Sequence, residues 1–463
     1  MKRTAAPFLI IIILASATLL YVRMRVTEAR RAYYSKHLRS VSAAARPREA
    51  LPRPISSPAH APRVSAPEGA HPSAAPFTLK VEKAEGETYV WLTARDADLK
   101  RLLAAMAKES GVRMAADADL FEKVTADFSR CPLDDCLRKI SPNFCLTYVK
   151  SGGRTILSEA TILRSAINEA GRQLTRAPRT HIATLRYGSG AGEVGFVNTP
   201  EVERQGPESF AVDAQGNVCI CDTVNGRVQI ISPEGKPLAQ FPVNGRISDI
   251  AVDERGDIFI LNETAHALQR YDRSGGMTGE IPLPPDIFAA KGILTYQGRK
   301  FYLSDHDQYT RELARLENGN LATGSMKKTA GAHARVVGDY LFMTRRVSGE
   351  SSEIRVMDGE GNAVRTIGLN IPGLLSIVFL GQDVKGNGYI QIEESKGPAE
   401  VGLRVLKVSP GGGVIGSTDY MPNKYMCHTA RLLTVTQKGT IYQMLPTGTG
   451  CDLNIYAWEQ DGK

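Results

Sequence analysis

The sequence predicts a mainly β protein: a six-bladed β-propeller closed by an N-terminal strand, preceded by a small α+β domain and a transmembrane helix. Three observations lead to this prediction. From about residue 206 a pattern of paired strands, polar loops and turns recurs, the last repeat lacks its fourth strand, and an apolar run stands near the N-terminus. Repeats of this length, each too small to bury a core alone, are typical of propellers.

The predicted domains follow one another along the chain. They are a membrane anchor or signal segment over 1–34, a Pro/Ala-rich linker over 35–77, an α+β domain over 78–165, a second linker over 166–180, and the propeller over 181–463.

The first segment contains an apolar run over 5–22, directly after a short basic stretch. A bilayer core of ~30 Å needs ~20 apolar residues, so this run predicts a single-pass anchor. By the positive-inside rule, the charges that flank the run would keep the residues after it in the cytoplasm. The small residues Ala15-Ser16-Ala17 fit a cleavage site, which leaves a removed signal peptide as the alternative. The linker that follows is rich in Ala, Pro and Ser and cannot bury enough apolar surface to fold.

The net charge of +8 is unevenly spread along the chain. Residues 1–63 contain twelve Lys or Arg and two Glu, a net of +10, so the remainder carries about −2. Because the predicted propeller has no basic excess, the sequence argues against nucleic acid as its partner.

The small domain shows alternating strands around two helical patterns. Residues 96–110 predict a helix with Leu99, Leu102, Leu103 and Met106 on one face and a glycine stop. A second helix begins at Pro132, with Leu133, Cys136, Leu137 and Ile140 inward. The stretch from Asp96 to Ile140 resembles the short N-terminal domain of secretins and TonB-dependent receptors. This resemblance implies a periplasmic module that contacts other proteins and has no catalytic residues. It also implies, against the positive-inside rule, that the membrane-anchored propeller lies on the extracytoplasmic, periplasmic side.

The repeats give the propeller its predicted blade count and closure. Equivalent third-strand positions are spaced by 40 to 50 residues, the ~40–50 of a four-stranded blade, at Val228, Leu268, Leu313, Ile354, Leu403 and Leu453. The sixth repeat stops after its Asp461-Gly462 turn, whereas the strand-like stretch His181 to Gly188 precedes the first repeat without a partner. We therefore expect that stretch to complete the last blade.

The first two repeats, over 206–235 and 247–275, resemble the NHL repeat family. The resemblance lies in Ala-Val-Asp before a Gly turn and in the run from Asp222 to Arg227 after the next strand. It implies a propeller that binds proteins or RNA or supports an enzyme, so function stays open. At the Asn-Gly-Arg position, Arg227 is expected to pair with an acidic turn.

The loops between strands two and three share a face with the blade-to-blade connections. We expect this face to bind a partner through Asn225, Arg227, His266, His306, Arg345, Arg346 and His428. The predicted function is a membrane-anchored binding or scaffold protein without catalytic residues or cofactor. Its small domain would dock to envelope proteins, including a secretion or transport assembly.

The alternative is a propeller enzyme, lactonase- or lyase-like, with a divalent metal over the central channel. Calcium or zinc would be held by Asp305, His306, Asp307, Glu393 and His428. The sequence contains no nucleophile elbow, no HExxH, no P-loop and no dinucleotide fingerprint, which favours the binding protein over the enzyme.

The chain has seven cysteines and no CxxC pair. Cys219 and Cys221 alternate in one strand and are predicted to fill the core. Cys427 and Cys451 are expected to open on the same face of the sixth blade, where a disulfide is compatible with an oxidising compartment.

Overall fold

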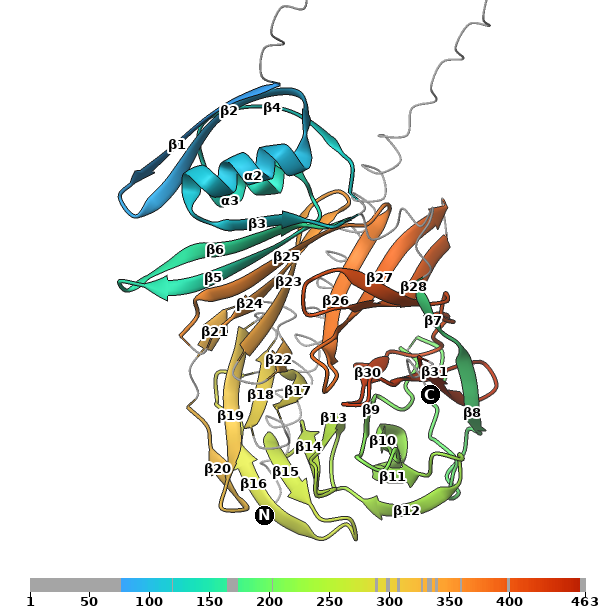
Figure 1. Ribbon diagram of the computed structural model, residues 1–463. Helices are drawn as coiled ribbons and strands as arrows, with labels where there is room; N and C mark the ends of the chain where they lie inside the picture. Colours follow the sequence, from blue (N-terminus) through green and yellow to red (C-terminus); the bar gives the residue numbers. More distant parts are fainter. Residues whose placement is uncertain are drawn as a thin grey trace, which may run out of the picture. The chain divides into compact units, whose positions relative to one another are not determined.

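Figure 1 shows a computed structural model of the chain. The structure describes residues 76–458 with the exception of 119, 165–173, 202, 288–289, 297–299, 306–308, 326–327, 331–334, 338–339, 359 and 398–399.

The small domain packs two helices against two groups of strands. Its elements are β1 (Phe77–Ala84), β2 (Glu87–Asp98), α2 (Leu99–Ser110), β3 (Arg113–Ala116), β4 (Lys123–Pro132), α3 (Leu133–Ile140), β5 (Phe144–Ser151) and β6 (Arg154–Ile162). Strands β1, β2 and β4 form one antiparallel sheet, while β5 and β6 form a hairpin that β3 joins in parallel.

Helix α2 ends where the pattern predicts it but begins three residues later, because residues 96–98 belong to β2. The Asp98 side chain accepts a hydrogen bond from the Arg101 backbone N–H at 2.9 Å, which satisfies a free donor of the first turn. Gly111 ends the helix with φ of 76°, a left-handed conformation that favours glycine. The predicted inward residues Leu99, Leu102, Leu103 and Met106 are all buried in the core of the domain.

After the small domain the described residues form six successive antiparallel sheets. The first contains β9 (Ser209–Val212), β10 (Val218–Asp222), β11 (Arg227–Ile231) and β12 (Pro237–Pro242), with the short 3-10 helix η1 (Thr223–Asn225) between β10 and β11. The second contains β13 (Ile247–Val252), β14 (Ile258–Asn262), β15 (Ala267–Tyr271) and β16 (Met277–Pro282). The third contains β17 (Ala290–Tyr296), β18 (Lys300–Asp305), β19 (Tyr309–Glu317) and β20 (Asn320–Thr323), and β21 (Lys328–Ala330) pairs with β19.

The remaining three sheets follow the same order. The fourth contains β22 (Arg335–Val337), β23 (Tyr340–Ser348), β24 (Ser351–Met357) and β25 (Ala363–Asn370). The fifth contains β26 (Leu374–Gln382), β27 (Gly388–Gly397), β28 (Glu400–Val408) and β29 (Val414–Thr418). The sixth contains β30 (Leu433–Val435), β31 (Ile441–Pro446), β32 (Cys451–Tyr456) and β8 (Arg179–Leu185).

The sixth sheet takes its outer strand from the beginning of the repeat region. Strand β8 pairs antiparallel with β32, with Leu185 opposite Cys451 and Thr184 opposite Asp452. The strand-like stretch that had no partner in the sequence therefore becomes the fourth strand of the last sheet, as predicted.

Apolar side chains fill the space between neighbouring sheets. One cluster joins the first sheet to the second, and it includes Cys219 and Cys221, which are 2% and 0% exposed. Their predicted place in the core is thus confirmed. Because strand residues alternate between faces, each sheet can bury apolar side chains against both of its neighbours.

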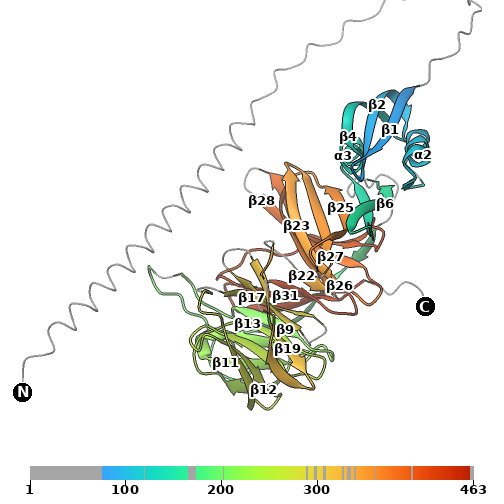
Figure 2. The ribbon, with the colours of Figure 1, turned by 90° about the vertical axis from the view of Figure 1, so that its left-hand side faces the viewer.

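The small domain is joined to the fourth sheet by strand pairing. Strand β5 pairs antiparallel with β25, so β22-β23-β24-β25-β5-β6-β3 form one seven-stranded sheet (Figure 1; Figure 2 labels β22, β23, β25 and β6 from the side). Gly368 of β25 lies against the ring of Phe144, and Arg138 of α3 binds Glu353 of β24 at 3.0 Å. Within the predicted linker 166–180, β7 (Thr175–Ala177) adds to the edge of β29.

The membrane-anchoring part of the prediction needs correction. In the part of the chain that the structure describes, no helix is long and apolar enough to cross a membrane. The longest, α2, has 12 residues and spans about 18 Å, short of the ~30 Å of a bilayer core. The predicted fold class with a transmembrane helix and the single-pass localisation are contradicted by this finding. The run over 5–22 itself lies outside the described residues.

Candidate functional site

One five-residue turn joins the first two strands of several sheets. In the first sheet, the Asp213 carboxylate accepts hydrogen bonds from the backbone N–H groups of Gln215 and Asn217, at 2.9 and 2.8 Å. Gly216 closes the turn with φ of 88°, where a residue with a side chain would be strained. The same bonding recurs at Asp253 and at Asp383.

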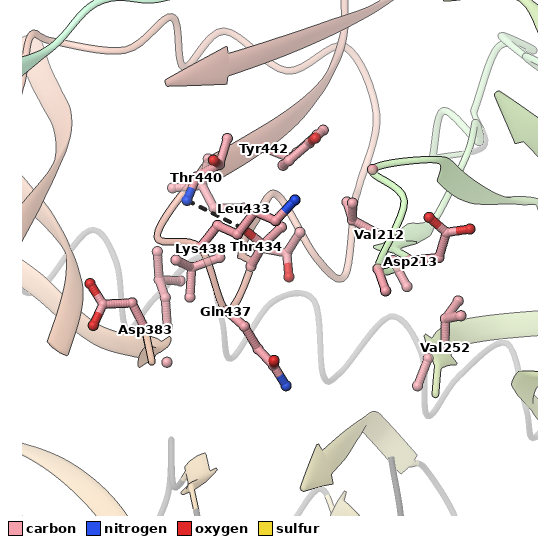
Figure 3. A pocket seen from close by; sticks show the side chains of 18 of the residues that line it. Val212, Asp213, Val252, Asp383, Leu433, Thr434, Gln437, Lys438, Thr440 and Tyr442 are labelled. Carbon is pink, nitrogen blue, oxygen red and sulfur yellow. Dashed lines mark hydrogen bonds between the residues drawn. The ribbon is translucent and has the colours of Figure 1, made fainter. Parts of the chain in front are cut away.

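These turns surround a cavity of about 1020 Å³. Each of the six sheets contributes lining residues, so the cavity lies on the common axis of the inner strands. In Figure 3, Gln437 of the β30–β31 turn extends between Asp383 on one side and Val252 on the other. This volume is at the upper end of the range usual for small-ligand sites, ~300–1000 Å³.

The cavity wall combines aliphatic and polar side chains in similar measure. Val212, Val252, Val337, Leu380 and Val435 are half-buried and come from five different sheets. Such a surface favours apolar groups of a ligand because it removes them from water.

Carboxylates gather at the end formed by the turns. Burial raises the pKa of Asp253 above its usual range. Burial would also raise the pKa of Asp383, but hydrogen bonds from Asn387, Tyr389 and the turn backbone outweigh burial and lower it. Exposed Lys438 supplies a positive charge at the same end.

A buried ion pair lies at the other end of the inner strands. Arg431, just before β30, donates from Nη2 to the Asp249 Oδ2 atom and to the Ile293 carbonyl, each at 2.7 Å. The Asp249 carboxylate also accepts from the Ser209 hydroxyl and from the Ile293 backbone N–H. One guanidinium thus connects the sixth sheet to the second and third, and Arg431 also lines the cavity.

The residues that the sequence predicted to bind a partner lie mostly at the strand ends opposite the turns. Two of them hold the fold together. Arg227 is buried, and it bonds to Asp222 Oδ2 at 2.8 Å and to three backbone carbonyls, at residues 189, 190 and 193. Asn225 donates to the Gly188 carbonyl and to Asp222, at 2.9 and 2.8 Å. The predicted pairing of Arg227 with an acidic residue is confirmed.

The other predicted partner residues are more accessible. Arg345 and Arg346 are exposed on β23, the first within 3.4 Å of Glu353 and the second bonded to the Gly349 carbonyl. His428 is exposed, whereas His266 is half-buried, with a ring nitrogen 3.3 Å from the Pro284 carbonyl oxygen. His306 lies outside the described residues.

The predicted metal site is only partly within the described chain. His306 and Asp307 lie outside it, and Asp305 ends β18. Glu393 is half-buried, with its pKa raised by burial. Among described residues, no group of three or more His, Cys, Asp or Glu could hold a metal ion. Calcium or zinc binding, and with it the alternative of a propeller enzyme, stays a prediction.

The predicted disulfide is absent from the structure. All seven cysteines, Cys427 and Cys451 included, are buried free thiols. Burial raises the pKa of Cys427 to about 11, so its thiol stays protonated at neutral pH.

The sequence argument overlooked the cavity and Arg431. The motif Asp-x-x-Gly after an inner strand was a usable signal, since it occurs at Asp213, Asp253 and Asp383. From the sequence alone, the Gly turns after these strands were evidence for the fold and not for a binding site.

Residues 205–231 match the NHL repeat family. Together with the succession of four-stranded antiparallel sheets, this match makes the chain a β-propeller protein that carries an NHL repeat.

No curated protein matches the sequence, but solved structures resemble the fold. A streptogramin B lyase is 13% identical, with a TM-score of 0.34, over 57% of this chain and 97% of that chain. A virginiamycin B lyase from Staphylococcus aureus is 12% identical, with a TM-score of 0.33, over 54% and 94%. A protein of unknown function from Desulfotomaculum acetoxidans is 13% identical, with a TM-score of 0.37, over 53% and 82%. At these TM-scores the likeness supports no statement about the function of this chain.

Proposed function

We propose that the chain is a non-enzymatic binding protein, a six-bladed NHL-type propeller that receives a segment of a partner protein in its axial cavity. The observation that carries the proposal is the cavity of about 1020 Å³, lined by aliphatic side chains from five sheets, by other polar groups and by carboxylates at the turn end. An apolar concave site with a few convergent polar groups is the usual form of a binding site.

The small domain is proposed to be a second contact module, similar to the short N-terminal domain of secretins and TonB-dependent receptors. Its attachment through β5 and β25 supports a fixed placement beside the fourth blade. Envelope proteins, including a secretion or transport assembly, stay predictions as partners of this module.

The cavity can be tested by filling it. A library of random heptapeptides, biotinylated at the amino end and free at the carboxyl end, is offered to the purified chain. Val252→Trp places a large ring at the cavity wall, and Leu238→Trp is the control on the outer strand β12, where Leu238 is 57% exposed. Circular dichroism and thermal unfolding check that both variants fold.

We expect peptides that bind the unchanged chain and the Leu238→Trp variant and that lose binding to Val252→Trp. Equal retention by Val252→Trp would contradict the proposal, and so would the absence of any retained peptide.

A further inference from the structure

We propose that the axial cavity binds the carboxyl-terminal end of a polypeptide chain, with the terminal carboxylate at Arg431. This inference rests on the proposed function, because it names the part of the partner that the cavity holds.

The argument begins with the donors of Arg431. Both hydrogens of Nη2 are used, one toward Asp249 and one toward the carbonyl of Ile293. The N–H groups on Nε and Nη1 have no bonding partner among the described residues. Arg431 lines the cavity, and its side chain is 20% exposed. Because both Nη2 hydrogens are occupied, no two-pronged edge of the guanidinium is free, but the N–H groups on Nη1 and Nε can each donate a single charge-assisted hydrogen bond to a carboxylate oxygen.

The ion pair with Asp249 positions Arg431 and leaves it able to bind an anion. Asp249 is 2% exposed, and its charge is also stabilised by bonds from the Ser209 hydroxyl and the Ile293 N–H. Asp249 and the Ile293 carbonyl hold the guanidinium through its Nη2 atom alone. A rigid, partly desolvated guanidinium binds an anion more strongly than a mobile one in water.

The separation between Arg431 and the turn end of the cavity fits a few residues of extended chain. Asp249, which binds Arg431, and Asp253, which begins the turn, lie four residues apart on β13 and the turn after it. Four residue steps of a strand span about 13 Å, which is the length of three or four residues of an extended peptide. The aliphatic wall between these ends would contact the last side chains of such a peptide.

The turn end favours a basic residue of the peptide. Four acidic residues line it, Asp213, Asp253, Glu254 and Asp383, against one lysine, Lys438. A peptide with its carboxylate at Arg431 would place the residue three or four positions upstream among these carboxylates. A Lys or Arg there would complete the charge complementarity, which sets specificity and register.

The test compares acid and amide forms of the same peptide on the unchanged chain. Peptides whose binding is lost in Val252→Trp are synthesised with a free carboxylate and with a carboxamide, and their affinities are measured by fluorescence anisotropy. We expect the amide to bind about tenfold or more weakly, the effect of removing a charge-assisted hydrogen bond. This comparison needs no variant that might misfold.

A double comparison separates binding by Arg431 from its contribution to the fold. The Arg431→Gln variant should weaken the acid form to the level of the amide and leave the affinity of the amide unchanged. A purely structural role would weaken both forms by the same factor.

The outcomes distinguish the two proposals. Equal affinity of acid and amide would overturn the carboxylate inference while the cavity remains the binding site. Loss of cavity dependence would overturn both. Displacement of the peptide by hexanoate at the affinity of the peptide itself would assign the site to small aliphatic acids and overturn the peptide inference.

Discussion

The strongest prediction concerns Arg227, which fastens the segment before the first sheet. Its guanidinium donates hydrogen bonds to Asp222 and Gln240 at 2.8 Å. The pair is shielded from water, because the Arg227 side chain is 10% exposed and that of Asp222 is 0% exposed. The carbonyls of Ser189, Gly190 and Glu193 are also bonded to it, at 2.8 to 2.9 Å. Arg227→Ala would therefore leave a buried carboxylate without its cation and would remove one hydrogen-bond donor from each of three carbonyls.

The size of the effect follows from these contacts. Breaking one partner of a buried ion pair costs about 3–5 kcal/mol. At about 4 kcal/mol, opening of the segment 186–197 becomes about 10³-fold more frequent. Hydrogen–deuterium exchange measures it, because Gly195 donates its N–H to Asp222 at 2.8 Å and Val194 to the Arg186 carbonyl at 2.9 Å.

Two variants make the measurement decisive. Arg176→Ala is the matched control, since Arg176 and Asp419 form an exposed pair at 2.6 Å, and such pairs contribute little. Arg227→Lys keeps the charge without the planar fork, so its exchange should lie between that of the unchanged chain and Arg227→Ala. Exchange over 186–197 that is unaltered in Arg227→Ala would refute the reasoning.

Three further predictions test the packing and the electrostatics. Burial raises the pKa of Glu393, so the chain loses stability as the pH rises from the usual carboxyl value of 4.5 through the raised one; Glu393→Gln should raise the unfolding temperature at pH 7 and have no effect below pH 4.5. Gly361 and Gly235 both have a left-handed backbone conformation, each in its own turn. A Cβ added at Gly361 would meet no atom within 4 Å, whereas one added at Gly235 would lie 2.6 Å from the Cβ of Ala183 in β8. Thermal unfolding should therefore show a loss of about 1 kcal/mol for Gly361→Ala and a larger one for Gly235→Ala. Gly368→Val should clash with the Phe144 ring and raise hydrogen exchange in β5 while α2 stays protected; equal protection of β5 would count against the packing at this junction.

The sequence pattern predicted those elements that depend on residues close together in the chain. The helical face of Leu99, Leu102, Leu103 and Met106 follows from spacing, because every one of them must point to the same side of α2. The pairing of β8 with β32 was predictable for a different reason, since one strand was missing and one was left over. The transmembrane helix was predicted from the length of the apolar run over 5–22. None of the described helices is long and apolar enough to cross a membrane.

The attachment of β5 to β25 was beyond sequence reasoning. Both are strands of eight residues, and no pattern in either indicates which strand edge it will pair with. The meeting depends on the absence of a side chain at Gly368, which makes room for Phe144, and on Arg138 reaching Glu353. Such complementarity between distant surfaces becomes visible only once both are folded.

The cavity was not predicted from the sequence, because the turns that line it share their sequence motif with turns in other parts of the fold. Asp272 and Asp358 begin turns of the same bonding pattern between the outer strands, away from the cavity lining. The motif therefore specifies a turn and not its position. Arg431 stands in no motif, and only the three-dimensional arrangement places it beside Asp249.

The outer strands β5, β7 and β8 have a consequence for the order in which the chain folds during its synthesis. Their contacts lie far along the chain: Lys150 meets Glu360 across 210 residues, Thr175 meets Ile415 across 240, and Thr184 meets Asp452 across 268. At a translation rate of ~5–20 residues per second, β8 waits about 10–50 s for β32. During that interval three strands present unpaired edges, which are sites of aggregation. The nascent chain is therefore expected to depend on a chaperone until the last sheet is made.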